Sequence, residues 1–250
     1  MKHLNLTALT LCIGLVALSP AWAAQYAASG IRSEDKTVSR QQTLSERQKA
    51  ILPIGAFTAV GDMPRLRKAF VRGLDSGLTI NEIKEMVVQL YAYVGFPRSL
   101  NALTELMDVL RDREARGIKD VVGTLPSALP MPDKMLAAGT NNQTKLVGAP
   151  VSGPLYEFAP AVDEYLKAHL FGAIFARDNL DWQARELTTV GALSALDGVD
   201  AQMLSHMNIS LNVGLSESQL RQAVEVLRTQ VDGKAARNAD EALERQLASQ

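Results

Sequence analysis

Cysteine is almost absent from this chain, whose 250 residues include one, Cys12, inside an apolar N-terminal run. Without a second thiol, a disulfide framework within the chain, a multi-thiolate metal site and a redox pair of cysteines are all excluded. The fold must therefore depend on its hydrophobic core. The roughly 225 residues that follow the apolar run are enough to bury a substantial one.

Aromatic residues and an excess of charge of one sign are also scarce. Phe, Trp and Tyr make up 5% of the chain, and 26 Lys and Arg face 27 Asp and Glu, for a formal net charge of −1. A chain rich in Ala, Leu, Gln, Glu and Arg and poor in aromatics favours an all-α fold. The balanced charge gives no basis for binding nucleic acid or an anionic membrane surface, so we expect neither as a partner.

The one long apolar stretch lies at the N-terminus. Lys2 and His3 precede an apolar run over 6–18, and Ala21-Trp22-Ala23 has the small-x-small form of a cleavage site. This pattern predicts a secretory signal peptide over 1–23, too short for a membrane anchor and cleaved after Ala23. The protein is then periplasmic or secreted, is not membrane-bound after cleavage, and starts with a polar segment over 24–43.

Two segments of the chain superimpose without a gap at an offset of 137 residues. Gly-Leu-Thr at 77–79 falls on Gly-Leu-Ser at 214–216, and capping boxes follow in both copies, with Glu82 and Gln219 as the reciprocal partners. We therefore predict two similar units in tandem, over 44–117 and 159–231. Helices are expected over 45–60, 64–76, 80–94 and 97–115, then over 160–176, 182–196, 201–213 and 217–231.

The remaining segments connect or close these units. Residues 118–158 contain five prolines and several glycines, which predicts a long irregular connection, either an arm or a lid. A polar helix over about 234–247, within the C-terminal segment 232–250, is expected to end the chain.

A tyrosine-rich helix end over 89–94 runs into Gly95-Phe96-Pro97 and then Asn101, and the second unit carries Arg-Glu-Leu at 185–187 before His206. This order of motifs resembles the carboxymuconolactone decarboxylase family, within the alkylhydroperoxidase-like group. The resemblance implies a compact all-α helical bundle with the two units as a pseudo-dimer. It also implies a homo-oligomer, a trimer or another ring of two-unit chains.

The peroxidase branch of that group depends on two cysteines separated by two residues. Counted from Glu85 at that branch's spacing, the cysteine positions fall near Pro97 and Leu100. Peroxide reduction by a cysteine pair is therefore excluded for this sequence, even if a peroxidase activity is attributed to the group as a whole.

Glu82, Glu85, Gln89 and Tyr93 are spaced by three, four and four residues and so share one face of a helix. Two readings stay open: a solvated face, or a pocket roofed by the Gly-Phe-Pro turn. His206, among apolar neighbours, is either a core histidine or a catalyst. The resemblance implies His206 as proton donor or oxyanion partner, Glu85 as general acid or base and Tyr93 as hydrogen-bond donor.

The implied substrate is a small carboxylic acid or lactone, decarboxylated without a cofactor. Arg98 is expected to hold the substrate carboxylate, with Gln89 and Phe96 as further binding residues. His169 has a weaker claim to a role. Neither it nor His206 has metal-ligand spacing to another residue, so no metal site is expected.

Each unit lacks a candidate site residue that the other unit has. At the same offset His206 corresponds to Ala69, and Glu85 corresponds to Gln222. Either one composite site spans the two units, or two sites have decayed independently. Three functions therefore compete: a decarboxylase-like lyase, a thiol-free relative of the peroxidases, and a non-catalytic exported binding or scaffold oligomer.

Overall fold

The structure, a computed structural model, describes residues 42–249, and these residues contain helices and no strand. The predicted signal peptide and nearly all of the polar segment after it lie outside the described residues. The first helices are α2 (Glu46–Val60), α3 (Met63–Asp75) and α4 (Ile80–Ala115). After these come η1 (Pro132–Lys134), α5 (Met135–Val147), α6 (Pro154–Phe158), α7 (Pro160–Glu164), η2 (Tyr165–Ile174), α8 (Trp182–Ser194), α9 (Asp200–Asn212), α10 (Glu217–Gln230) and α11 (Gly233–Leu247).

The helix ends follow the local signals in the sequence. Both predicted capping boxes are formed, at the start of α4 with Thr79 and Glu82 and at the start of α10 with Ser216 and Gln219. Inside α4 the chain leaves helical geometry at Gly95, which has φ 80° and ψ 159°. A positive φ is accessible to Gly at little cost, so this break separates the two helices predicted on either side of it.

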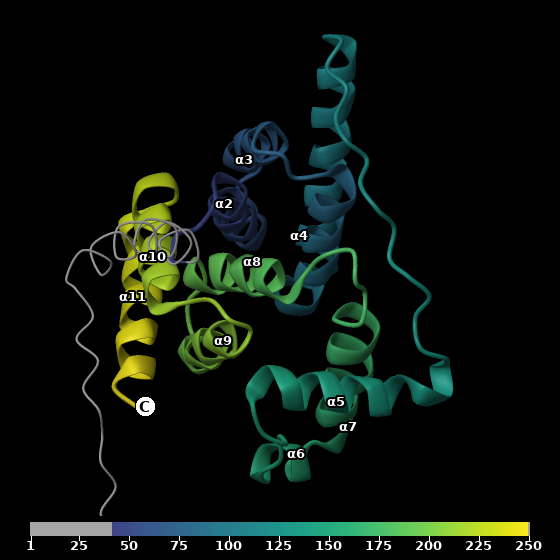
Figure 1. Cartoon of the computed structure of the whole chain (residues 1–250), viewed down its shortest axis with the longest axis vertical. Helices are drawn as coiled ribbons and strands as arrows, with labels where there is room; N and C mark the ends of the chain where they lie inside the picture. Colours follow the sequence, from purple (N-terminus) through teal and green to yellow (C-terminus); the bar gives the residue numbers. More distant parts are fainter. Residues whose placement is uncertain (1–41, 250) are drawn as a thin grey trace, which may run out of the picture. The chain divides into compact units, whose positions relative to one another are not determined.

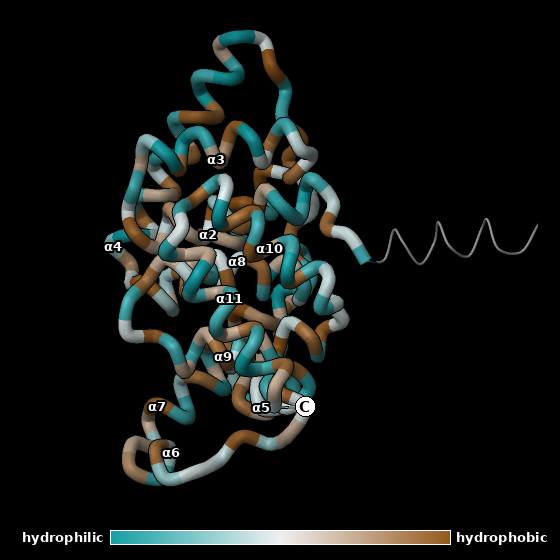
Figure 2. The backbone as a smooth tube through the Cα atoms, turned by 90° about the vertical axis from the view of Figure 1, so that its left-hand side faces the viewer, coloured by the Kyte–Doolittle hydropathy of each residue, from teal (hydrophilic) through white to brown (hydrophobic). Residues whose placement is uncertain are grey.

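The centre of the bundle is the crossing of α2 and α8, which lie between α4 and α10 (Figures 1 and 2). Glycine allows the two helices to approach closely. A Cβ atom at Gly55 would lie 2.3 Å from the carbonyl oxygen of Thr188, and one at Gly191 would lie 2.4 Å from that of Leu52. Because both helices are buried on nearly all sides, the polar residues of α8 face partners rather than water.

The helix bounds agree with the 137-residue offset. Helix α3, shifted by that offset, has the bounds of α9, and the start of α4 falls on the start of α10. The turn glycines also agree, with φ 90° at Gly77 and 92° at Gly214. The same shift places the part of α4 after Gly95 on α11. These agreements support the duplication, which stays a prediction.

The connection over 118–158 is irregular only in part. Residues 118–131 are extended and run back beside α4, where the amides of Ile80 and Asn81 donate to the carbonyls of Val121 and Val122 (Figure 1). The expectation of an irregular chain is wrong for 135–147, which forms α5. Helix α5 is held by tertiary contact, since its Gly139 packs against the backbone of η2 and Leu146 is fully buried.

Two further details differ from the sequence prediction. The segment predicted as one helix from 160 begins as a short α-helix and continues as the π-helix η2. Helix α11, expected to be polar, is amphipathic. It buries an apolar face whose members are small or branched: Ala235, Ala236, Ala239, Ala242 and Leu243. That face packs on α10 and α9 and closes the bundle.

Candidate active site

A buried carboxylate from α4 meets a buried guanidinium from α8. Glu85 is 2% exposed and Arg185 is fully buried, and Arg185 Nη2 donates to Glu85 Oε1 at 3.1 Å. Gln89, one turn along α4, accepts from Arg185 Nη1 at 3.0 Å and donates to the Arg185 carbonyl at 3.0 Å and to Thr189 Oγ1 at 2.8 Å. The face of α4 that carries Glu85 and Gln89 is therefore buried against α8, and the solvated-face reading is wrong for it.

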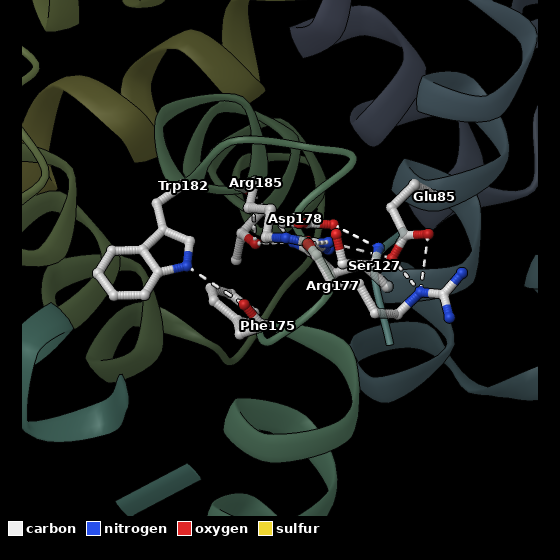
Figure 3. Close-up of polar contacts among 9 residues, drawn as sticks. Glu85, Ser127, Phe175, Arg177, Asp178, Trp182 and Arg185 are labelled. Carbon is white, nitrogen blue, oxygen red and sulfur yellow. Dashed lines mark hydrogen bonds and ion pairs between the residues drawn. The ribbon is translucent and has the colours of Figure 1, made fainter. Parts of the chain in front are cut away.

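A second cation, Arg177, also pairs with Glu85. Arg177, in the segment between η2 and α8, places its Nε 2.8 Å from Oε1 and 2.9 Å from Oε2 of Glu85 (Figure 3). Arg185 also donates to the Arg177 carbonyl at 2.7 Å. Burial lowers the pKa of Arg185, and the nearby charge of Glu85 opposes that shift. Two guanidinium groups on one carboxylate leave an excess of positive charge beside it.

Glu186, which follows Arg185 in α8, forms a second buried pair with His206 of α9. His206 of α9 is 7% exposed, Glu186 is fully buried, and His206 Nδ1 lies 2.7 Å from Glu186 Oε2. The contact with Glu186 orients the imidazole and leaves Nε2 as the nitrogen available for proton exchange. The ring of Tyr93 meets that of His206 edge-on, with 5.5 Å between the centroids. Tyr93 of the first predicted unit therefore contacts His206 of the second.

Three polar atoms around this pair lack a partner. Within residues 42–249, the buried Tyr93 hydroxyl, Glu186 Oε1 and Ser210 Oγ form no hydrogen bond. Ser210 follows His206 by one turn of α9. Buried polar atoms without partners are rare in folded proteins, so their presence on and beside a His–Glu pair makes this place the candidate active site.

The remaining predicted residues lie apart from this centre. Phe96 is 61% exposed and stacks on Tyr91, with 4.3 Å between the ring centroids. Arg98 is half-buried, and in the described part of the chain no hydrogen bond or ion pair connects it to Glu85 or His206. Glu82 belongs to the capping box and pairs with Arg47. His169 is exposed, near the Tyr91 ring at 5.4 Å.

Two residues of the site were missed from the sequence. Glu186 adjoins Arg185 in the Arg-Glu-Leu motif, but each of them pairs across the bundle, Arg185 with Glu85 and Glu186 with His206. The Arg-Glu-Leu motif was the signal in the sequence that could have identified Glu186 as a site residue. Arg177 has no comparable signal, because it lies in an irregular segment and its partner is 92 residues away.

The environment of Tyr93 predicts a loss of stability at high pH. Burial, and then the charge of Glu186, raise the pKa of Tyr93 above its ordinary value of 10.0. Between the unfolded and the folded pKa, the folded state holds a proton that the unfolded state has released. Stability therefore falls as the pH rises above about 10.

Urea unfolding at about pH 9 and about pH 11 measures this effect. Tyr93→Phe should show a smaller fall than the unsubstituted protein, and Tyr165→Phe, at an exposed position, should fall as the unsubstituted protein does. Equal falls in all three proteins would remove Tyr93 as the cause.

Among residues 42–249, no three His, Cys, Asp or Glu side chains lie close enough together to hold a metal ion. Nor does any helix in the same range have the length and apolarity needed to cross a bilayer.

These features define an all-α bundle with a buried His–Glu pair next to a buried Arg–Glu cluster. Residues 160–245 match the model of the carboxymuconolactone decarboxylase family, which is the family that the sequence motifs resemble. The match runs from α7 into α11 and includes Arg177, Glu186 and His206, whereas Glu85 and Tyr93 precede it. A comparison with curated proteins gave no match.

Proposed function

We propose that this protein is a cofactor-free carboxy-lyase that decarboxylates a small carboxylic acid or lactone at His206. The observation that carries the proposal is the buried His206–Glu186 pair, 2.7 Å apart, with the unpartnered Tyr93 hydroxyl in its surroundings. The family match over 160–245 supports the same reaction class.

In this reaction the bond between carbon and the carboxylate breaks and CO₂ leaves. The electron pair of the broken bond moves into a conjugated carbonyl and gives a dienolate. His206 then donates a proton to the carbon and regains one from water. Glu186 holds the imidazole in place through its contact with Nδ1. The Tyr93 hydroxyl donates a hydrogen bond to the developing oxyanion. Such a bond stabilises the oxyanion most where water is excluded.

Glu85 takes a different role in this proposal from the one its position in the sequence implied. Both of its carboxylate oxygens accept from Arg177, and Oε1 also accepts from Arg185. We assign it to positioning: it holds Arg185 and thereby the α8 turn that carries Glu186. The site is then composite, with Tyr93 and Glu85 from the first unit and Glu186 and His206 from the second.

The proposal includes export and self-association. An exported chain favours a periplasmic or extracellular substrate over carboxymuconolactone itself, whose catabolism is cytoplasmic in the enzymes that this chain resembles. A homo-oligomer is supported by a row of exposed apolar residues on α4, with Phe96 61%, Leu100 57% and Met107 62% exposed. Contiguous apolar surface of this kind marks protein interfaces.

The test is decarboxylation by the full-length chain and by the chain starting at Ala24. A panel of γ-lactone acids and conjugated keto acids is incubated with each, and release of CO₂ is measured. Turnover of at least one panel member supports the lyase. Absence of CO₂ release throughout favours the non-catalytic binding oligomer, and consumption of hydrogen peroxide would favour a thiol-free peroxidase.

A further inference from the structure

A second candidate ligand site lies outside the His206–Glu186 pair. A cleft of about 540 Å³ opens between α5, the end of η2 and the start of α8. Arg177 and Lys145 supply its positive charge, Asp178 and Asp181 its negative charge, and Trp182 an aromatic wall. His206, Glu186 and Tyr93 are not among its lining residues.

The two carboxylates of the cleft are engaged by the protein. Asp178 Oδ1 accepts from the Ser127 amide at 2.8 Å (Figure 3). Asp181 is the N-cap of α8, and its Oδ1 accepts from the Ala184 amide at 2.7 Å. Both acids therefore stabilise the local backbone, at the Ser127 segment and at the first turn of α8.

Arg177 and Lys145 both carry N–H donors without an acceptor in the described part of the chain. Arg177 uses Nε on Glu85, and within residues 42–249 its two Nη atoms donate no hydrogen bond. Lys145 is exposed at the end of α5 and forms no ion pair or hydrogen bond in the same range. The formal charges of the lining cancel, but Arg177 and Lys145 hold N–H donors that no protein acceptor uses within residues 42–249. A ligand that offers acceptor oxygens matches these donors.

The aromatic wall is fixed in place. The Trp182 indole donates to the Phe175 carbonyl at 3.3 Å, and the Phe175 ring lies 5.5 Å below the Arg185 guanidinium carbon (Figure 3). The indole is only partly buried and so offers a flat apolar surface in the cleft that the two cations also line. Pockets for small molecules combine such a surface with a few placed polar groups.

We propose that this cleft binds a small organic carboxylate with a flat apolar body. The carboxylate accepts from Arg177 and Lys145, and the body lies against Trp182. Glu85 positions Arg177 from behind, so the cleft is coupled to the buried cluster. The site extends beyond the proposed reaction, since binding here requires no turnover at His206.

Benzoate is the probe, and Trp182 is the reporter. The chain has two tryptophans, so a full-length Trp22→Phe protein leaves Trp182 as the sole indole. Benzoate should change its fluorescence saturably. Benzamide, of the same shape without the charge, should bind about tenfold or more weakly, because charge-assisted hydrogen bonds are the stronger kind. Absence of a saturable benzoate signal, or equal affinity for both probes, overturns the proposal.

Substitution locates the carboxylate. Lys145→Gln should weaken benzoate binding by about tenfold, and Lys119→Gln, at an exposed position outside the cleft, should leave it unchanged. Unchanged binding in Lys145→Gln would contradict the assignment. His206→Gln should bind benzoate as the unsubstituted protein does, so failure of the lyase and failure of this site are separately visible.

Discussion

Replacing His206 with Gln should lower turnover of the decarboxylated substrate by about 10²–10⁴-fold, the usual contribution of a positioned general acid or base. Gln fills a similar space and can donate its amide N–H to Glu186, but it cannot exchange a proton. Because Glu186 is fully buried, His206→Ala would leave its carboxylate without a partner, so a loss of activity in that variant would be confounded with unfolding.

The measurement is kcat and KM for the panel member with the fastest CO₂ release. His169→Gln is the matched control, since His169 is exposed and lies outside the pair, and it should retain its rate. Circular dichroism should show the same helix content in both variants. If His206→Gln keeps more than about a tenth of the rate, His206 supports the core and the catalytic proposal is wrong.

Removal of the Glu85 carboxylate should be the most destabilising change at this site. Glu85→Ala leaves Arg185, fully buried, without its carboxylate partner, and a guanidinium does not shed its charge as a lysine does. Breaking a buried ion pair from one side costs about 3–5 kcal/mol. For a domain of this size we therefore expect the thermal midpoint to fall by about 2–4 °C per kcal/mol.

Urea unfolding of Glu85→Ala, Glu85→Gln and Glu46→Ala tests this expectation. Glu85→Gln keeps a hydrogen-bond acceptor for Arg185 and should lose less than Glu85→Ala. Glu46 is 81% exposed in its pair with Lys49, so its replacement should cost about 0–1 kcal/mol, as for other surface pairs. If Glu85→Ala and Glu46→Ala lose equal stability, the buried cluster does not stabilise the fold.

The all-helical class and most of the helix ends and turns follow from the amino-acid sequence alone. These depend on short-range chemistry: Thr79 caps a helix with the residue three positions on, and Gly95 breaks one through its own backbone freedom. The Gly-Phe-Pro turn and the Arg-Glu-Leu motif were also sufficient to predict the family. His206 and Tyr93 were predicted as candidate site residues, but the contact between their rings was not predicted.

The pairing of the buried charges depends on the packing of the helices and could not be predicted from the sequence. Glu85 pairs with Arg177 and Arg185, which are 92 and 100 residues away, and Glu186 pairs with His206 and not with its neighbour Arg185. Helix α5 was likewise missed, since its sequence favours helix weakly and packing against η2 holds it. The same physical reason applies to the pairing of Glu85, to the pairing of Glu186 and to helix α5. Burial makes an unpaired charge or an uncovered apolar face costly, and the partner that relieves this cost is chosen by the packing of distant helices.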